Sequence, residues 1–236
     1  MIKIIEHRTG WCDDFVNFED KKLQNTEQGF ENSFSRGNGV ETDIRDVCGK
    51  LIISHNMPKG NEMSFEGILK TYNKYSCEGF LALNVKCDGM QDEIKTLLNK
   101  YNIKNYFMFD MSVPDAIIYL QKEIDCYIRD SEYELYPKET SPYFYEKASG
   151  VWLDQFTENR NDKIDLKLIK KYLNDNKNIC IVSPELHSWG RKNDLYIQRW
   201  EEYKSIINTL RKEEYDLNKI SLCTDLPIQA KDFFNN

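Results

Sequence analysis

The chain has 236 residues, of which 40% are hydrophobic and 30% are charged. This balance is typical of a folded domain and excludes a disordered or low-complexity chain. Asp and Glu outnumber Lys and Arg by 39 to 32, so the net charge is −7. A general polyanion-binding surface is therefore excluded, and we expect no nucleic acid partner. A small phosphorylated ligand stays compatible, because one or two arginines inside a pocket act at close range.

The cysteines and the N-terminal residues indicate the cellular compartment in which we expect the protein. The seven cysteines form no CxxC pair and are odd in number. Several lie in apolar runs, such as those around Cys126 and Cys180, and this predicts reduced core thiols. The first residues reach Glu6 too soon for the apolar region of a signal peptide. No run approaches the ~18 apolar residues of a membrane span. We expect a cytoplasmic protein with no membrane span, and its oligomeric state is open.

Short apolar runs that end in a polar residue recur along the chain, and helix-like segments separate them. The runs lie at 2–6, 40–47, 80–85, 106–109, 126–128, 151–153, 179–182 and 220–224. Helical spacing is found at 64–75, 89–101, 114–122, 165–173 and 195–211. Three of these segments follow residues with N-cap side chains: Ser112, Asp165, and Asn193 or Asp194.

Eight strands that alternate with helices predict parallel βαβ units. In a chain of this length they favour a single (β/α)8 TIM barrel, of the α/β class, over an open doubly wound sheet. No GxGxxG or GxxxxGK motif follows any run, which also weighs against the open nucleotide-binding sheet. A turn at 48–50 and a further run at 51–54 predict a small β-hairpin insertion after the second strand, and residues 130–148 predict a long, irregular loop. No linker or repeat divides the chain, so we expect residues 1–236 to form one domain.

Ionisable residues end most of the runs, where a barrel carries its reacting groups. Glu41 and Asp43 are two positions apart on a predicted strand, so their side chains point to the same face. Two such carboxylates repel each other unless a proton or cation lies between them, and Mg²⁺ or Ca²⁺ suits that position. All three histidines also follow apolar runs: His7, His55 and His187.

Taken one at a time, these residues have simpler interpretations. His7 alone is compatible with a core histidine, and Glu41 with Asp43 is compatible with a solvent-facing strand. Their coincidence with Arg8 and His55 at strand ends favours a site for phosphate ester chemistry. In such a site a metal and cationic side chains bind the phosphate, and the histidines move protons. For His187, structural and substrate-contacting roles both stay open.

A series of short motifs runs along the chain. They are His7-Arg8, Glu31-Asn32-Ser33, Glu41-Thr42-Asp43, His55 after the hairpin run, Leu83-Asn84-Val85-Lys86 and Thr224-Asp225-Leu226-Pro227. This series resembles the glycerophosphodiester phosphodiesterase family, over nearly the whole chain. The resemblance implies the (β/α)8 barrel that this family shares with phosphatidylinositol-specific phospholipases C.

The resemblance also implies roles for single residues. His7 and His55 match the two histidines that act as general acid and base. Arg8 matches the arginine that contacts the phosphate, and Glu41 and Asp43 match two metal-binding carboxylates.

The third carboxylate position of the family is held here by Asn84, and Lys86 matches the lysine two residues beyond it. The carbonyl oxygen of an Asn can ligate Mg²⁺ or Ca²⁺ but brings no charge. Asp110, on the next strand, is the candidate to compensate. The motifs differ from the family at two further positions, where Thr9 replaces a glycine and Asn56 replaces an aspartate.

We predict an enzyme that hydrolyses a small glycerophosphodiester-like substrate to an alcohol and a phosphomonoester, with one divalent cation, Mg²⁺ or Ca²⁺, as cofactor. The residues expected to line the pocket for the alcohol lie at later strand ends: Arg129, Trp152, Glu185 and His187. The motifs assign neither which histidine is the acid nor whether water or a substrate hydroxyl attacks. The alternatives are a non-catalytic barrel that binds phosphate esters and a lyase-type enzyme that releases a cyclic phosphate.

Overall fold

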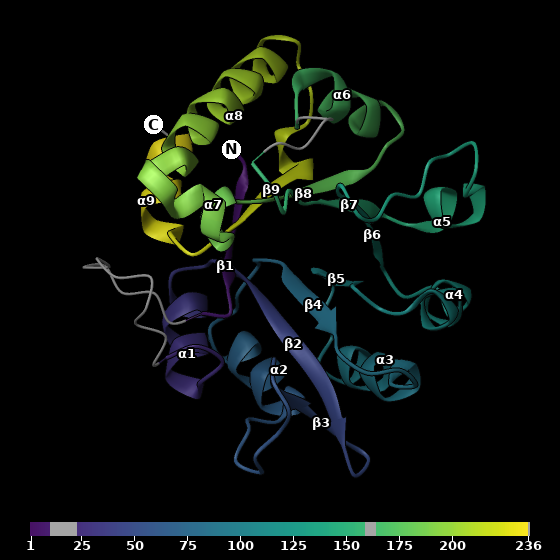
Figure 1. The fold of residues 1–236 in the computed structure, drawn as a ribbon. Coiled ribbons are helices and arrows are strands. Elements are labelled where there is room, and N and C mark those ends of the chain that lie inside the picture. The colour runs from purple at the N-terminus through teal and green to yellow at the C-terminus, as the bar shows by residue number, and fades with distance from the viewer. Residues whose placement is uncertain (10–22, 159–163, 236) are drawn as a thin grey trace. The chain divides into compact units, whose positions relative to one another are not determined.

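The computed structural model describes residues 1–9, 23–158 and 164–235. Strands and helices alternate through these residues (Figure 1). The chain divides into two units, each with its own part of the sheet. The N-terminal unit is Ile5–Cys126, and the C-terminal unit is Met1–Ile4 with Tyr127–Asn236.

The strands of the N-terminal unit are parallel, apart from β3. The first strand begins at Lys3, two residues before the start of the unit at Ile5. The elements are β1 Lys3–His7, α1 Glu27–Ser35, β2 Gly39–Val47, β3 Lys50–Ile53, α2 Phe65–Lys74, β4 Leu81–Val85, α3 Gln91–Lys100, β5 Tyr106–Phe109 and α4 Val113–Gln121. The strand order is β5-β4-β2-β1, and β3 pairs antiparallel with β2. The register places His7 opposite Glu41 and Asp43 opposite Asn84. This register brings polar side chains of three strands to neighbouring positions.

Burial of apolar faces explains why these segments form these elements. All five residues of β4 are buried, as expected for an inner strand of a parallel sheet covered on both faces. In α2, the buried residues Phe65, Ile68, Leu69 and Tyr72 recur with helical spacing and form one apolar face. The helix begins after Ser64, whose side chain accepts the N–H of Gly67 at 3.0 Å.

The C-terminal unit contains the four remaining parallel strands in the order β9-β8-β7-β6. Its elements are β6 Tyr127–Asp130, α5 Pro142–Lys147, β7 Gly150–Leu153, α6 Leu166–Asn174, β8 Asn178–Val182, η1 Pro184–Leu186, α7 Ser188–Arg191, η2 Lys192–Asp194, α8 Leu195–Lys212, η3 Leu217–Lys219, β9 Ile220–Thr224 and α9 Pro227–Asn235. Trp200 of α8 packs on Phe234 of α9, with ring centroids 5.5 Å apart. Apolar packing therefore joins the two helices that flank β9.

The predicted fold class is confirmed: eight parallel strands with helices between them give the (β/α)8 topology, and β3 is the predicted hairpin strand. The irregular loop predicted at 130–148 contains the short helix α5. Asp165 caps α6 by accepting the N–H of Leu168 at 2.8 Å. Asp194 stands at the start of α8 but makes no capping bond, since its backbone is left-handed. No described helix is both long and apolar enough to cross a membrane.

The prediction of buried thiols holds for most of the cysteines. Cys77, Cys126, Cys180 and Cys223 are buried. Cys48, in the hairpin turn, is exposed, so the prediction is wrong for that residue. Cys12 lies outside the described residues.

Candidate active site

Two carboxylates on β2 form the centre of the candidate site. Glu41 is 2% exposed and Asp43 is fully buried, and the period of two along the strand places both on one face. His7, the last residue of β1, lies opposite Glu41, with its Nε2 3.8 Å from Glu41 Oε2. The predicted pair of carboxylates is thus buried beside a histidine.

Two cationic side chains contact Asp43 from opposite neighbouring strands. Arg8 Nε lies 3.3 Å from Asp43 Oδ2, and Lys86 Nζ lies 3.3 Å from Asp43 Oδ1. Arg8 follows β1 with a φ of 57°, and its N–H donates to the carbonyl of Glu41 at 2.9 Å. Thr9, at the position of the family glycine, has a φ of 64°. That left-handed conformation favours glycine, and the threonine adopts it in a buried position.

Burial shifts the protonation of Glu41. Together with the neighbouring charge of Asp43, it raises the pKa of Glu41 to about 7, against the opposing effect of His7, Arg8 and Lys86. A proton or an added cation would relieve the repulsion between the two carboxylates.

His55 follows the hairpin strand β3 and is exposed. Its Nδ1 lies 3.0 Å from Asn56 Oδ1. Partial burial lowers the pKa of His55, and the positive charge of Arg8 lowers it further. At neutral pH the imidazole is therefore neutral and can accept a proton.

Arg45 is a positioning residue that the motifs did not identify. Its Nε donates to the carbonyl of Ser54 at 3.1 Å and its Nη2 donates to the carbonyl of His55 at 2.9 Å. Its Nη1 donates to the carbonyl of Lys86 at 3.3 Å. Arg45 thus ties the segment that carries His55 to the end of β4. Its position, two residues beyond Asp43 on the same face of β2, is a signal that the sequence does contain.

Four buried oxygen atoms at this site lack a hydrogen-bond donor among the described residues. They are Glu41 Oε2, both carboxylate oxygens of Asp43, and Asn84 Oδ1. Asn84 donates its Nδ2 to Asp110 Oδ2 at 3.0 Å, which orients the amide and leaves its Oδ1 available. Carboxylate and amide oxygens are the donors that Mg²⁺ and Ca²⁺ prefer.

These residues fit a hard divalent cation. Across the described ranges, no group of three or more His, Cys, Asp or Glu side chains is arranged to hold a metal. At this site the third oxygen belongs to the amide of Asn84, a residue type outside that set. The oxygen ligands available to a cation are therefore two carboxylates and one amide. Asp110 places a further carboxylate next to that amide, where it accepts the hydrogen bond from Asn84 Nδ2.

The remaining predicted residues lie in the C-terminal unit, where several of them form a separate cluster. Asp154 accepts from His187 Nε2 at 2.7 Å and pairs with Arg129 Nη1 through its other oxygen. The ring of Phe156 lies 5.0 Å from that of His187. Burial acts to raise the pKa of Asp154, but the hydrogen bond and charge of His187, with Arg129, hold it below the ordinary value. Trp152 is 4% exposed, within β7. That these residues line the pocket for the alcohol stays a prediction.

Glu185 is also in the C-terminal unit and joins the ends of two strands. It accepts from the hydroxyls of Ser183 and Thr224, and from the N–H of Asp225 at 3.1 Å. Burial raises the pKa of Glu185 to about 7, although these donors oppose the shift. Both carboxylate oxygens are engaged, so this buried group links the ends of β8 and β9, and its predicted contact with the substrate stays a prediction.

We expect Glu185 to make stability depend on pH. An acid whose pKa rises from 4.5 to about 7 on folding contributes stability that is present below pH 4.5 and is lost as pH rises to 7. The Glu185→Gln variant removes this titration, a difference of up to about 3 kcal/mol between the two pH limits. Urea unfolding at pH 5 and pH 7.5, with a chelator present, measures it. The same pH dependence in both proteins would contradict this assignment.

Comparisons with known proteins give structural neighbours only. No family model matches the sequence, and no curated protein matches it. A candidate glycerophosphodiester phosphodiesterase from Galdieria sulphuraria aligns with a TM-score of 0.66 and 16% identity, over 100% of this chain and 98% of that chain. A glycerophosphodiester phosphodiesterase from Agrobacterium tumefaciens aligns with a TM-score of 0.64 and 12% identity, over 100% of both chains.

A third solved structure contains a bound product. It is a phosphodiesterase from Oleispira antarctica in complex with the product sn-glycerol-3-phosphate, with a TM-score of 0.61 and 10% identity over 99% of this chain and 97% of that chain. At these identities the likeness shows the fold. The resemblance that the motifs carry is therefore confirmed at the level of the fold.

Proposed function

We propose that the protein hydrolyses a small glycerophosphodiester-like substrate to an alcohol and a phosphomonoester, with Mg²⁺ or Ca²⁺ as cofactor. The observation that carries this proposal is a group of buried oxygens that accept no hydrogen bond among the described residues. They belong to Glu41, Asp43 and Asn84, and Arg8 and Lys86 contact Asp43 beside them. An anion-neutralising cation and two cationic side chains are what a phosphate diester requires. The shared fold with glycerophosphodiester phosphodiesterases supports the same reaction.

Glu41, Asp43 and Asn84 would hold the cation. When bound, it would neutralise charge on the non-bridging phosphate oxygens. Arg8 and Lys86, each in contact with Asp43, would orient those same oxygens from two sides.

The two histidines supply the proton transfers. Because the lowered pKa of His55 leaves its imidazole neutral, we assign it the base, which takes a proton from the attacking water. The oxygen of that water forms a bond to phosphorus, and the bond from phosphorus to the departing alcohol oxygen breaks. His7 is then the acid, which gives a proton to that oxygen. Its contact with Glu41 keeps its imidazole in place.

A hydrolysis screen tests the proposal. Glycerophosphodiesters with different alcohols, and nucleotide-linked and sugar-linked diesters, are incubated with Mg²⁺, Ca²⁺ or Mn²⁺, and parallel samples contain a chelator. We expect turnover of at least one glycerophosphodiester and its loss on chelation. If no diester is hydrolysed with any ion while phosphate esters still bind, the non-catalytic alternative is favoured.

Asp110 provides a test that does not depend on turnover. The Asp110→Ala variant removes the acceptor that orients the Asn84 amide and removes a nearby negative charge. We expect its Kd for Mg²⁺ to rise by about 10-fold, since losing a residue that orients a ligand typically costs 10- to 100-fold in affinity. Titration calorimetry measures the change, and Asp92→Ala on α3 serves as a matched control. Equal affinity in all three proteins would show that Asp110 does not position the amide.

A further inference from the structure

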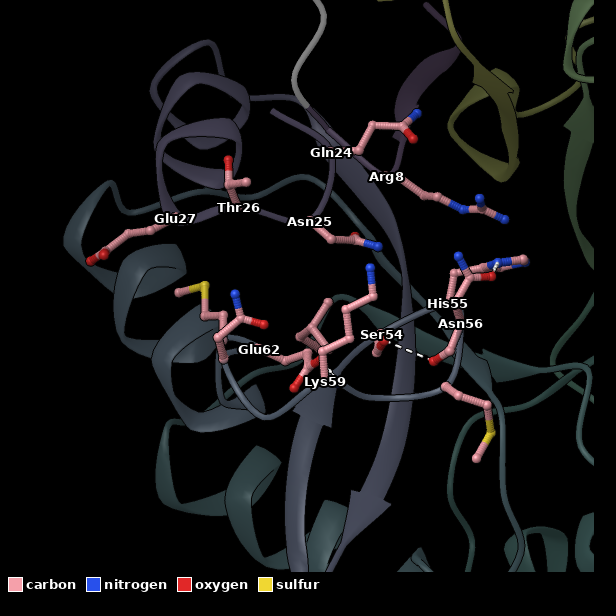
Figure 2. A pocket seen from close by; sticks show the side chains of 14 residues that line it. Arg8, Gln24, Asn25, Thr26, Glu27, Ser54, His55, Asn56, Lys59 and Glu62 are labelled. Carbon is pink, nitrogen blue, oxygen red and sulfur yellow. Dashed lines mark hydrogen bonds between the residues drawn. The ribbon is translucent and has the colours of Figure 1, made fainter. Parts of the chain in front are cut away.

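A cavity of about 600 Å³ adjoins the candidate active site within the N-terminal unit. Arg8 and His55 line one side of it, and the rest of the wall comes from residues 24–27, 53–54, 56–57, 59 and 61–63 (Figure 2). It thus opens beside the histidine that we assign as the base and the arginine that contacts the phosphate. Any alcohol group of the substrate on this side of the phosphate would enter this cavity.

The segment that follows His55 is held by a side chain that caps its backbone. Glu62 accepts the N–H of Lys59 and, at 2.9 Å, the N–H of Gly60. These bonds, that from Lys59 first, hold the pKa of Glu62 below its ordinary value. The carboxylate is therefore used to shape the turn that carries Lys59.

The ammonium group of Lys59 has no carboxylate partner in the part of the chain that the structure describes. No Asp or Glu oxygen there lies within 4.0 Å of its Nζ. Figure 2 shows the side chain extending from its turn into the cavity, toward Asn25. Its charge is thus available to a ligand.

A hydrogen-bond donor, the amide of Asn25, also faces the cavity from the opposite wall. Thr42 donates its hydroxyl to Asn25 Oδ1 at 2.9 Å, and this contact fixes the amide so that its NH₂ group remains for a ligand. The cavity therefore offers the NH₂ group of Asn25 and the Lys59 ammonium, a pair of donors that complements an oxyanion.

We propose that the cavity binds an alcohol group that carries a second oxyanion, a carboxylate or a phosphate, and that Lys59 selects for it. This inference rests on the proposed function and specifies its substrate class: diesters whose alcohol next to His55 is anionic. Arg8 is committed to Asp43 and the reacting phosphate, so Lys59 is the cation that remains for the second anion.

Two matched pairs of substrates test this specificity. In the first pair, glycerophosphoserine has one carboxylate more than glycerophosphoethanolamine. In the second pair, glycerophosphoglycerol is compared with its derivative that carries a phosphate ester on the terminal hydroxyl. In at least one pair we expect kcat/KM of the wild type to favour the anionic member by about fivefold, the upper range for a solvent-exposed ion pair. Lys59→Met should abolish that preference through KM, with little change in kcat, and Lys59→Arg should keep it. Added salt should weaken it.

The controls separate this proposal from the proposed function. Lys104→Met, an exposed lysine that does not line the cavity, should leave the preference intact. Equal kcat/KM within both pairs, or a preference that survives Lys59→Met, would overturn the proposal while the hydrolase function stands. If no diester is turned over at all, titration of the wild type and Lys59→Met with glycerol 3-phosphate and with free serine phosphate decides: stronger binding of serine phosphate that depends on Lys59 supports the anion site, and equal binding refutes it.

Discussion

Replacing either His7 or His55 with Ala should lower kcat for diester hydrolysis by at least ~10²-fold, the loss expected when a positioned acid or base is removed. His7 Nε2 lies 3.8 Å from a Glu41 carboxylate oxygen, and His55 lines the same cavity as Arg8. Both changes remove a ring without touching the buried apolar core, so the thermal unfolding midpoint should stay within a few degrees of the wild type. Steady-state kinetics and calorimetric melting measure the two effects.

The leaving group separates the two roles. An alcohol that leaves as a stable anion needs no proton, so bis(p-nitrophenyl) phosphate should restore much of the activity of His7→Ala and little of that of His55→Ala. Lys104→Ala, an exposed substitution in the same unit, is the control for handling and folding. Unchanged diesterase activity in both histidine variants would refute the mechanism, and the opposite rescue pattern would exchange the acid and the base.

Asp43→Asn should lower kcat/KM by ~10²- to 10³-fold, comparable to removing a group that stabilises transition-state charge. The substitution removes the charge that both Arg8 and Lys86 contact at 3.3 Å, and it replaces one of the four buried oxygens that lack donors with an NH₂ group. The Kd for Mg²⁺ should rise by at least ~10²-fold, beyond the range for residues that only orient a ligand.

Calorimetric titration with Mg²⁺ and steady-state kinetics check this prediction together. Asp46→Asn is the matched control, since Asp46 lies three residues further along β2, is exposed and only caps the hairpin turn at Gly49. Wild-type affinity for Mg²⁺ in Asp43→Asn would place the cation elsewhere. Wild-type activity in that variant would refute the role of the carboxylate pair.

The strands could be predicted because each is a short apolar run, and such a run can be identified in the sequence without knowing which strand it pairs with. Two nine-residue helices were not predicted although they carry helical spacing. In α1, Phe30 and Phe34 are buried four residues apart, and in α9, Ala230 and Phe234 are. In α1 the polar motif Glu31-Asn32-Ser33 interrupts the apolar pattern, and α9 begins within the motif Thr224-Asp225-Leu226-Pro227. The short helices α5 and α7 have too few turns for a periodic signal.

The candidate site was predictable wherever one strand determines it. The same-face placement of Glu41 and Asp43 follows from the period of two along a strand. The pairing of Asp43 with Asn84 depends on register between strands, which apolar runs in a parallel sheet do not specify. The bond from Asn84 to Asp110 and the contact of Asp154 with His187 join residues 26 and 33 positions apart. Such contacts exist only once the chain has folded.

Phosphorus NMR of a glycerophosphodiester reaction with Mg²⁺ tests the central claim most directly, because it identifies the product as well as the rate. The wild type should convert the diester signal to that of a phosphomonoester, and a chelator or the double variant His7→Ala/His55→Ala should prevent this. A persistent cyclic phosphate signal would show that a substrate hydroxyl attacks instead of water. A diester signal that stays unchanged with every glycerophosphodiester and divalent ion would contradict the proposed function.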